Sequence, residues 1–351
     1  MSILNKLKKN TTVKETDVLE DSKFFSEKDV VQTQVPMINV ALSGALDGGL
    51  TPGLTMFAGP SKHFKTAFAL LLVKSYLDKY KDAAVLFYDS EFGSPSGYFK
   101  NMGIDPSKVI HTPITDIEKL KHDIMTQLND VERGDNLIIV IDSVGNLASK
   151  KEVDDAISGN TAADMTRAKQ LKSLFRMVTP HLNLKNIPMV VVNHTYMEIG
   201  MYPKAIVSGG TGSMYSADTV FIIGRQQEKN ASSNEVTGYN FILNVEKSRY
   251  VREKSKIPIE VSFDGGISTW SGLLEIALDS GHVTNPKQGW YQRQGDTKNY
   301  RKADTYTKDF WMPILNDTAF QTWVKDNFAI STSSLIADFD DETIAEEYDN
   351  A

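Results

Sequence analysis

Short apolar runs recur along the first two thirds of the chain and alternate with longer segments of helical character. The runs are LTMFAG (54–59), AVLFYDS (84–90), KVIHT (108–112), LIIVIDS (137–143) and MVVVNH (189–194). Continuous apolar runs of this length are typical of strands that are buried on both faces of a parallel sheet. We therefore expect these five segments to form one parallel sheet.

Two of the segments between the runs have helical patterns. Residues 116–132 place five apolar side chains on one helical stripe, namely Ile117, Leu120, Ile124, Leu128 and Val131. Residues 65–80 are apolar nearly all round, as expected of a helix packed deep against the sheet. The alternation of strand and helix predicts an α/β fold with a mostly parallel, doubly wound central sheet.

The pattern changes after about Asp218. Three strand-like segments separated by turns follow, at 219–224, 239–247 and 256–266. They predict an antiparallel extension of the same sheet. Residues 271–330 predict a small C-terminal part that is rich in aromatic side chains, namely Trp290, Tyr291, Tyr300, Tyr306, Phe310 and Trp311.

These patterns divide the chain into four expected parts. Residues 1–34 are polar and weakly patterned, which indicates an N-terminal arm outside the core. Residues 35–270 form the expected core, and residues 271–334 form the small C-terminal region. Residues 335–351 are an acidic tail that we expect to be disordered.

The formal net charge of -7 is concentrated at the C-terminus. Residues 335–351 carry seven acidic side chains and no basic one, so the rest of the chain has as many acids as bases. An acidic chain is an unusual nucleic-acid binder, but a neutral body with an acidic tail is compatible with that function. The tail is either a solvating segment or an anionic mimic that competes with polyanions for a basic groove.

Two absences narrow the function classes. The chain has no cysteine, which excludes disulfides, thiolate catalysis and cysteine-based zinc sites, and its six histidines lack an HExxH spacing. It also has no run of eighteen apolar residues and no secretory signal. We therefore expect a cytoplasmic protein without a membrane partner.

The stretch GPSKHFKT (59–66) is similar to a phosphate-binding loop. The loop pattern is Gly, four variable positions, then Gly-Lys-Ser/Thr, and Phe64 stands where the second glycine is expected. Lys65 would reach the β and γ phosphates, and Thr66 would hold Mg²⁺. A non-glycine residue costs about 1 kcal/mol or more if its position requires a positive φ, which an otherwise good site tolerates. The candidate nucleotide-binding residues are Gly59, Pro60, Ser61, Lys62, His63, Phe64, Lys65 and Thr66.

Two carboxylates follow neighbouring strands. Asp142 ends the run LIIVID, where it would orient Mg²⁺ and its waters. Glu91 follows LFYDS at the carboxyl edge of the sheet, where ligands of such sheets bind. It would deprotonate a water that attacks a γ-phosphate. Either residue alone could be structural, but together with the loop they form a hydrolytic set.

Three further stretches make the chain recognisable. They are FYDSEFGSPSGYFKNMGIDPSKVIHTP (87–113), IDSVGNLASKKEVDD (141–155) and VSGGTGSMYSADTVFII (207–223). With the loop, this ordered set resembles the RecA recombinase family, and most closely its phage members, which also carry Phe before the lysine. The resemblance runs from about residue 21 to about residue 311. It implies a RecA-like P-loop NTPase core that binds ATP and Mg²⁺.

The resemblance also implies roles for matching residues. Lys65 and Thr66 would bind phosphate and metal, Glu91 would be the catalytic carboxylate, and Asp142 would orient the metal. Tyr98 matches the aromatic residue that stacks on adenine in the family. The alternative for Tyr98 is a helix residue that packs on the sheet.

Three other residues match positions around the γ-phosphate. His194 follows Asn193 at the end of a strand, where the family has a polar sensor of the γ-phosphate that is usually Asn-Gln, so the histidine departs from bacterial RecA. Lys247 and Arg249 are two residues apart and therefore lie on one side of a strand. The matching pair in the family reaches the γ-phosphate on a neighbouring subunit, much as an arginine finger does. The alternative is a solvated basic edge strand.

DNA contacts are expected from two long connections, at about 146–160 and about 196–212. Glycines in the second let backbone amides approach phosphates. The helix between the two connections adds basic side chains, which would meet the phosphate backbone without reading sequence. The alternative for each base is a solvated helix face. The candidate residues are Arg167, Lys169, Lys172, Arg176, Gly209, Gly210, Thr211 and Gly212.

The function implied by the resemblance is that of an ATP-dependent recombinase. It would form helical filaments on single-stranded DNA and exchange strands with a homologous duplex, in recombination, repair and recombination-dependent replication. The expected partners are both DNAs, further copies of the chain docked through an arm that includes Phe24 and Phe25, a single-strand-binding protein and a loading mediator. A phage-encoded member would act in the host cytoplasm. A ring helicase on the same core and a non-catalytic accessory paralogue stay open as alternatives.

Overall fold

The computed structural model describes residues 2–22, 29–159, 165–201, 203–230 and 233–330. The predicted docking residues Phe24 and Phe25 and the acidic tail at 335–351 lie outside the described residues. Among the helices in the described ranges, none combines the length and the apolar composition that a membrane crossing requires.

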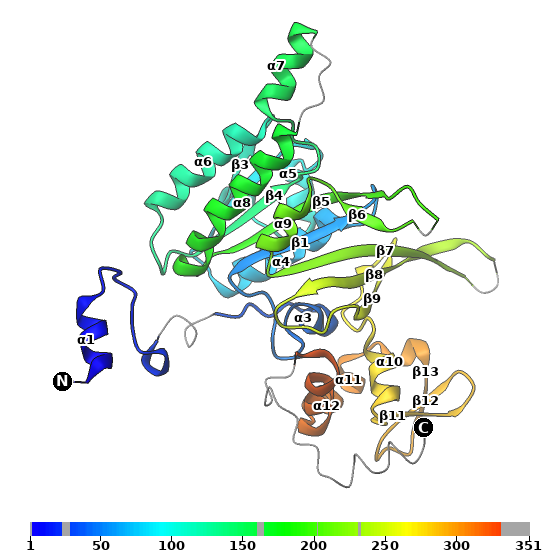
Figure 1. Ribbon diagram of the computed structural model, residues 1–351. Helices are drawn as coiled ribbons and strands as arrows, with labels where there is room; N and C mark the ends of the chain where they lie inside the picture. The colour runs from blue at the N-terminus through cyan, green and yellow to red at the C-terminus, as the bar shows by residue number, and fades with distance from the viewer. Residues whose placement is uncertain (1, 23–28, 160–164, 202, 231–232, 331–351) are drawn as a thin grey trace.

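One large sheet runs through the molecule (Figure 1). Its strand order is β10-β9-β8-β7-β1-β5-β4-β2-β3, and the strands from β7 to β3 are parallel. These strands are β1 (Gly53–Gly59), β2 (Ala84–Asp89), β3 (Val109–Pro113), β4 (Leu137–Asp142), β5 (Pro188–Met197) and β7 (Thr219–Lys229). All five apolar runs lie in this parallel part, which confirms the predicted fold class.

The strand β3 differs from the expected burial on both faces. It is the last strand of the sheet, and Ile110 in its middle is 60% exposed. Because the sheet ends at this strand, its side chains are less covered than those of the central strands. The apolar run therefore predicted the strand correctly, but its burial wrongly.

The antiparallel extension is confirmed for two of its three predicted segments. It consists of β8 (Val236–Ser248), β9 (Lys256–Ser262) and β10 (Gly266–Ile267), and β8 pairs with β7. The first predicted segment, 219–224, lies in β7, which pairs in parallel with β1, so its assignment to the extension was wrong. The core of the molecule is therefore one continuous mixed sheet.

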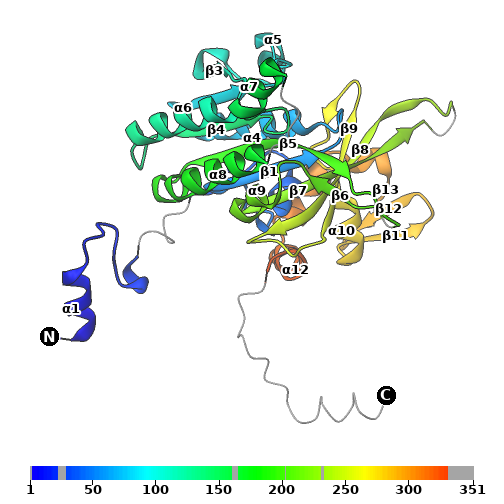
Figure 2. The ribbon, with the colours of Figure 1, turned by 45° about the horizontal axis from the view of Figure 1, so that its top comes forward.

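Helices cover both faces of this sheet (Figures 1 and 2). Neighbouring residues of a buried strand point to opposite faces, so Ile138 and Ile139 of β4 belong to two different hydrophobic cores. One core includes residues of α3 (Pro36–Ser43), α4 (Lys65–Lys79) and α5 (Ser96–Asn101), and the other includes residues of α6 (Ile117–Asp130) and α8 (Thr166–Lys185). The helices expected at 65–80 and 116–132 are confirmed, although Val131 follows α6 and is only partly buried.

The C-terminal part has a small sheet of its own. Its elements are α10 (Leu273–Asp279), β11 (Val283–Lys287), β12 (Trp290–Arg293), β13 (Asn299–Arg301), η3 (Lys302–Thr305), α11 (Lys308–Leu315) and α12 (Thr318–Phe328). Phe310 and Trp311 are buried in the same hydrophobic core as α3 and α4. Two of the aromatic residues noted in the sequence thus attach this part to the main sheet.

The N-terminal segment begins with an exposed helix. Helix α1 (Ile3–Asn10) has no buried residue and lies apart from the sheet in Figure 1, and η1 (Leu19–Asp21) follows it. Val31 forms a bridge with Leu50 and is buried. The packed core therefore includes residues slightly before position 35, and the four-part division of the chain stays a prediction.

The two connections expected to be long loops contain regular structure. Helix α7 (Lys150–Ser158) fills most of the first, with a capping box formed by Ser149 and Glu152, and it projects from the body in Figure 1. In the second, β5 extends to Met197 and pairs antiparallel with β6 (Ala205–Val207), and α9 (Thr211–Ser216) follows. The sequence predicted two long connections, and the structure adds that both contain regular elements.

Candidate nucleotide-binding site

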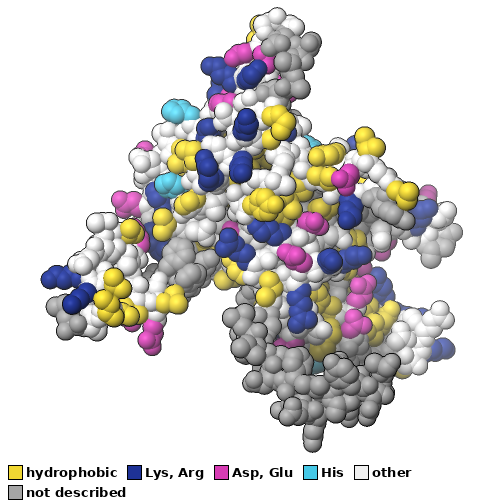
Figure 3. Space-filling model, viewed as in Figure 1, with side chains coloured by type: hydrophobic (Ala, Val, Ile, Leu, Met, Phe, Trp, Pro, Cys, Tyr) yellow, Lys and Arg dark blue, Asp and Glu magenta, His cyan; other side chains and the backbone are white. Residues whose placement is uncertain are grey.

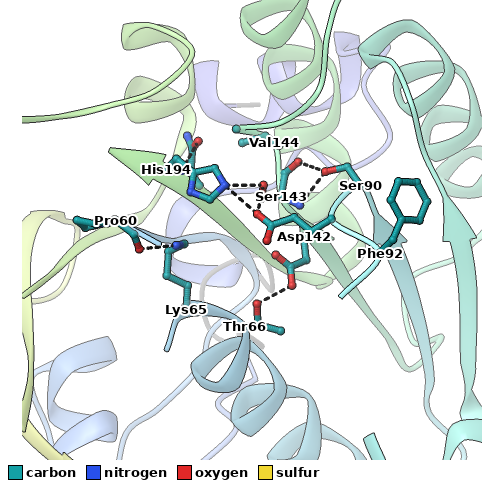
Figure 4. Close-up of polar contacts among 12 residues, drawn as sticks. Pro60, Lys65, Thr66, Ser90, Phe92, Asp142, Ser143, Val144 and His194 are labelled. Carbon is teal, nitrogen blue, oxygen red and sulfur yellow. Dashed lines mark hydrogen bonds and ion pairs between the residues drawn. The ribbon is translucent and has the colours of Figure 1, made fainter. Parts of the chain in front are cut away.

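The loop after β1 leads directly into α4 at the carboxyl edge of the parallel strands. The side chain of Lys65 is buried, and its Nζ donates a hydrogen bond to the carbonyl of Pro60 at 2.8 Å (Figure 4). Burial lowers the pKa of Lys65, while the negative charges of Glu91 and Asp142 act to raise it. Because the first amides of a helix have no intrahelical partner, the loop and the start of α4 offer backbone donors beside a cation.

Phe64 adopts a backbone conformation that favours glycine. Its φ is 61° and its ψ is 16°, in the left-handed region, which costs a non-glycine residue about 1 kcal/mol. Its ring stacks on Phe241 at a centroid distance of 5.1 Å and meets Phe68 edge-on at 5.7 Å. Such ring pairs contribute about 0.5–1.5 kcal/mol each, so the aromatic contacts offset the backbone cost.

Thr66 and Asp142 form a site that fits a magnesium ion. The Thr66 hydroxyl donates to Asp142 Oδ2 at 2.7 Å, while Oδ1 of the same carboxyl is buried without a hydrogen-bond partner. Burial is the main cause that raises the pKa of Asp142 to about 6, and the negative charges of Glu91 and Asp89 raise it further. The hydrogen bond from Thr66 and the charge of Lys65 act in the opposite direction. The Thr66 hydroxyl and the two oxygens of the Asp142 carboxylate are oxygen ligands of the kind that Mg²⁺ prefers.

Glu91 is held at the end of β2 by contacts with two other elements. Its backbone amide donates to Asp89 Oδ1, and its Oε1 accepts a hydrogen bond from the Ser143 hydroxyl at 2.7 Å. His194 Nε2 lies 2.8 Å from the same oxygen. The contact with His194 lowers the pKa of the Glu91 carboxyl most, the Ser143 hydrogen bond acts in the same direction, and partial burial acts against both. The carboxylate is thus kept ionised at the edge of the site.

His194 connects this carboxylate to the segment before α9. Its backbone carbonyl accepts from the Ser208 amide at 2.8 Å, and the neighbouring Asn193 side chain donates to the Ser208 carbonyl at 2.9 Å. On its other side the imidazole lies against Gly145, where a Cβ atom would come within 2.4 Å of His194 Cδ2. The sensor position of the sequence prediction is therefore in contact with both Glu91 and the second predicted DNA segment.

Tyr98 lies on α5 and is half-buried against the core on the α4 side of the sheet. Burial raises the pKa of its hydroxyl, and the charge of Asp142 adds to this. The position combines packing on the core with proximity to the Asp142 carboxylate. Stacking of Tyr98 on adenine stays a prediction.

Lys247 and Arg249 both contact their own protomer. Lys247 Nζ donates to the carbonyls of Met214, Tyr215 and Ala217, at 2.9, 3.0 and 2.7 Å, around the C-terminal end of α9. Arg249 Nε lies 2.8 Å from Oδ1 of the buried Asp218. Their expected contact with a neighbouring protomer's nucleotide stays a prediction, and it would require these side chains to leave their present partners.

Three of the four basic side chains predicted to contact DNA are exposed on α8. They are Lys169, Lys172 and Arg176, and Lys and Arg side chains are visible over the face of the molecule that carries α6 and α8 (Figure 3). The glycines of the second segment lie next to this helix. A Cβ atom at Gly212 would come within 2.7 Å of the Lys172 Cβ. The structure thus brings the two predicted DNA elements together.

Arg167 differs from the other three. Its Nε donates to the Leu147 carbonyl at 2.7 Å, and its Nη2 donates to the carbonyls of Val144 and Gly145 at 3.1 and 2.8 Å. In the sequence prediction, Arg167 is grouped with the other three as a candidate contact to DNA phosphate, with a solvated helix face as the alternative. It is instead engaged with the loop that follows β4.

Several residues of the site were missed in the sequence. Ser143 directly follows Asp142 in the stretch IDSVGN, and Gly145 lies three positions after it, so the signal was a serine and a glycine shortly after a strand-end carboxylate. Asp89 directly precedes the turn that carries Glu91 and caps two of its amides. A search for every polar residue within two positions of a strand end would have found Ser143 and Asp89, whereas the role of Gly145 depends on the His194 ring that the fold places against it.

A parallel strand with a phosphate loop that enters a helix, together with carboxylates at the carboxyl ends of the adjacent strands β4 and β2, defines a P-loop nucleotide-binding protein. A model of the RecA N-terminal domain matches residues 6–268, and a model of the C-terminal domain of the bacteriophage T4 recombination and repair protein matches residues 270–324. The chain belongs to the RecA family.

Individual relatives agree with the domain matches. The chain is 49% identical to the recombination and repair protein of Enterobacteria phage T4, over 97% of this chain and 90% of the relative. It is 25% identical to the RecA proteins of a Nocardioides species and of Streptomyces rimosus, over 75% and 78% of this chain and 73% and 72% of those relatives. The expected resemblance to the phage branch of the family is confirmed.

Proposed function

We propose that this protein is an ATP-dependent DNA recombinase that assembles on single-stranded DNA and exchanges strands with a homologous duplex. The observation that carries the proposal is the convergence of Lys65, Thr66, Asp142 and Glu91 at one edge of a RecA-type sheet. The similarity to a phage protein named for recombination and repair supports the same activity.

The nucleotide would be held by the loop, the start of α4 and Tyr98. Lys65 would exchange its hydrogen bond with Pro60 for one with a phosphate, and Tyr98 would stack on the adenine. Thr66 and Asp142 would hold Mg²⁺, which when bound neutralises charge on the phosphates.

Glu91 would act as the base of the hydrolysis. A carboxylate that accepts a proton from the attacking water makes this water a better nucleophile toward the γ-phosphate. Ser143 and His194 orient the carboxylate through Oε1, which leaves Oε2 for the water. Since His194 also contacts Ser208, a phosphate that displaces it from Glu91 would change the segment before α9.

Assembly would place the nucleotide between successive protomers. Lys247 and Arg249 would reach the γ-phosphate of the neighbouring protomer, and the N-terminal arm would dock on the adjacent core in an open, head-to-tail contact. The DNA would contact α8 and the segment 208–212, and the family suggests a single-strand-binding protein and a loading mediator as further partners. The similarity to a phage protein suggests the host cytoplasm as the place of action.

Strand exchange between a circular single strand and a homologous linear duplex tests the proposal. We expect joint molecules that require ATP and Mg²⁺, and filaments in electron micrographs with DNA and a slowly hydrolysed nucleotide. Rings in these micrographs would support a helicase instead. Wild-type protein without DNA-stimulated phosphate release would support a non-catalytic accessory protein.

The substitution Lys65→Ala tests the site itself. We expect DNA-stimulated hydrolysis to fall by about 100-fold or more, because a charge that stabilises the transferred phosphate is lost. Circular dichroism should show an unchanged fold. Lys74→Ala on the same helix is the control, since Lys74 pairs with Asp78 on the surface, and it should keep its turnover. Retained turnover in Lys65→Ala would remove this loop as the site of hydrolysis.

A further inference from the structure

Arg167 lies in the first turn of α8 and reaches the loop between β4 and α7, residues 143–149. Its three hydrogen bonds go to backbone carbonyls of this β4–α7 loop, those of Val144, Gly145 and Leu147. The planar guanidinium presents several donors in a fixed geometry, so one side chain can fix carbonyls at two points of the loop.

The same loop contacts the nucleotide site on its other side. The Ser143 hydroxyl donates to Glu91, and the backbone of Ser143 exchanges two hydrogen bonds with the Ser90 hydroxyl, at 2.6 and 3.1 Å. Gly145 packs against the His194 ring closely enough to exclude a side chain. A shift of the β4–α7 loop therefore moves the groups that orient Glu91 and His194.

Arg167 also lies beside the turn before α9. A Cβ atom on Gly209 would come within 2.5 Å of Leu171 Cδ1 and within 4.0 Å of Arg167 Nη1. The adjacent Ser208 is hydrogen-bonded to the backbone of His194. Arg167 thus lies between two segments that both contact His194.

We propose that Arg167 is a positioning residue for the nucleotide site and not a contact to DNA phosphate. It holds the β4–α7 loop so that Ser143 and Gly145 keep Glu91 and His194 in place. This inference rests on the proposed hydrolysis of ATP at Glu91. In it, the Arg167 side chain connects α8 to the Glu91 carboxylate through the β4–α7 loop.

Arg167→Ala and Arg167→Lys test the inference in the full-length protein. At saturating single-stranded DNA we expect Arg167→Ala to lower the kcat of ATP hydrolysis about tenfold or more, with the KM for ATP within about twofold of wild type. The salt dependence of DNA binding should keep its wild-type slope. A lost phosphate contact would reduce that slope by about 0.7, would leave kcat normal at saturating DNA, and would be rescued by lysine.

Hydrogen exchange gives a readout that does not depend on activity. Without nucleotide or DNA, amides of residues 143–149 should exchange faster in Arg167→Ala than in wild type. Arg252→Ala is the matched control, because Arg252 also donates to backbone carbonyls, those of Asp326 and Ala329, in the C-terminal part. It should leave both the exchange of 143–149 and the turnover unchanged.

The results separate the inference from the proposed function. Unchanged exchange in the β4–α7 loop of Arg167→Ala, or a wild-type kcat in this variant at saturating DNA, would overturn the inference. Absence of hydrolysis in the wild type would overturn the proposed function, and the exchange experiment would still decide whether Arg167 holds the loop. If Arg167→Ala does not fold, Arg167→Lys decides, and full wild-type turnover with wild-type exchange in that variant counts against the inference.

Discussion

Phe64 combines a strained backbone with stabilising side-chain contacts. Its positive φ favours glycine, whereas its ring stacks on Phe241 and contacts Phe68. The sequence showed the departure from the loop pattern, but it could not show the compensation, because Phe241 is distant along the chain and meets Phe64 only in the folded sheet.

Two substitutions at Phe64 separate these contributions. Phe64→Ala loses the ring and keeps the strain, while Phe64→Gly loses the ring and relieves the strain. We expect both to be destabilised, with the glycine variant more stable than the alanine variant by about 1 kcal/mol in urea unfolding. At Ala67, inside α4, the order should reverse, so that glycine is less stable by a similar amount. An alanine variant as stable as the glycine variant at Phe64 would contradict the strain.

The raised pKa of Asp142 predicts that the difference in stability between wild type and Asp142→Asn depends on pH. Its pKa of about 6 in the folded protein exceeds the usual value of 3.8, so the folded state holds the proton longer than the unfolded chain does. The stability from this proton is complete below about pH 4 and is lost as the pH rises through about 6. In chelator, Asp142→Asn should therefore become more stable than wild type across this interval, by roughly 1–3 kcal/mol.

Unfolding by urea at several pH values measures this difference. Added Mg²⁺ should stabilise the wild type and not Asp142→Asn, and the variant should not hydrolyse ATP. The exposed Asp78→Asn is the control and should show no such pH dependence. A constant difference between wild type and Asp142→Asn from pH 4 to 7 would mean that the buried carboxyl has its ordinary pKa.

At the level of elements, α9 is held at its C-terminal end by Lys247. A cation beside the last carbonyls of a helix satisfies acceptors that have no helical partner and favours the helix dipole. We expect Lys247→Ala to increase the exchange of amides in residues 208–217 by about fivefold to thirtyfold without nucleotide, from the loss of about 1–2 kcal/mol.

Hydrogen exchange with mass spectrometry checks this expectation. Lys256→Ala, on the neighbouring strand β9, changes an exposed lysine and should leave the same peptides unaffected. Equal exchange in Lys247→Ala and wild type would mean that Lys247 does not stabilise α9.

Strands and helices could be predicted where a local pattern of apolar residues marks their buried face. The apolar runs gave the five parallel strands, and the stripe of α6 gave its buried face, because burial on a sheet leaves a pattern in the sequence itself. The exposure of β3 depends on its place at the end of the sheet, which no local pattern contains. Helix α7 was missed because its residues are exposed, and only the cap from Ser149 to Glu152 marks its start.

The candidate site was predictable in its chemistry and less so in its contacts. Lys65, Thr66, Glu91 and Asp142 follow from motifs at strand ends. The engagement of Arg167 with three carbonyls and of Lys247 with three others depends on which loops the fold brings beside them. The sequence shows a basic residue, but only the tertiary structure shows whether it faces solvent or the protein.

At the scale of the whole molecule, the charge of the acidic tail is expected to affect the affinity for DNA. Seven acidic residues in 335–351 give the chain its negative balance, and the remaining residues are neutral overall. If the tail competes with DNA for the basic surface, deleting 335–351 should raise DNA affinity several-fold at low salt, and the gain should shrink as salt screens the charges. A variant with the acidic residues changed to Asn and Gln keeps the length and should behave like the deletion, which separates charge from bulk. Identical salt titrations for all three proteins would show that the tail only solvates the C-terminus.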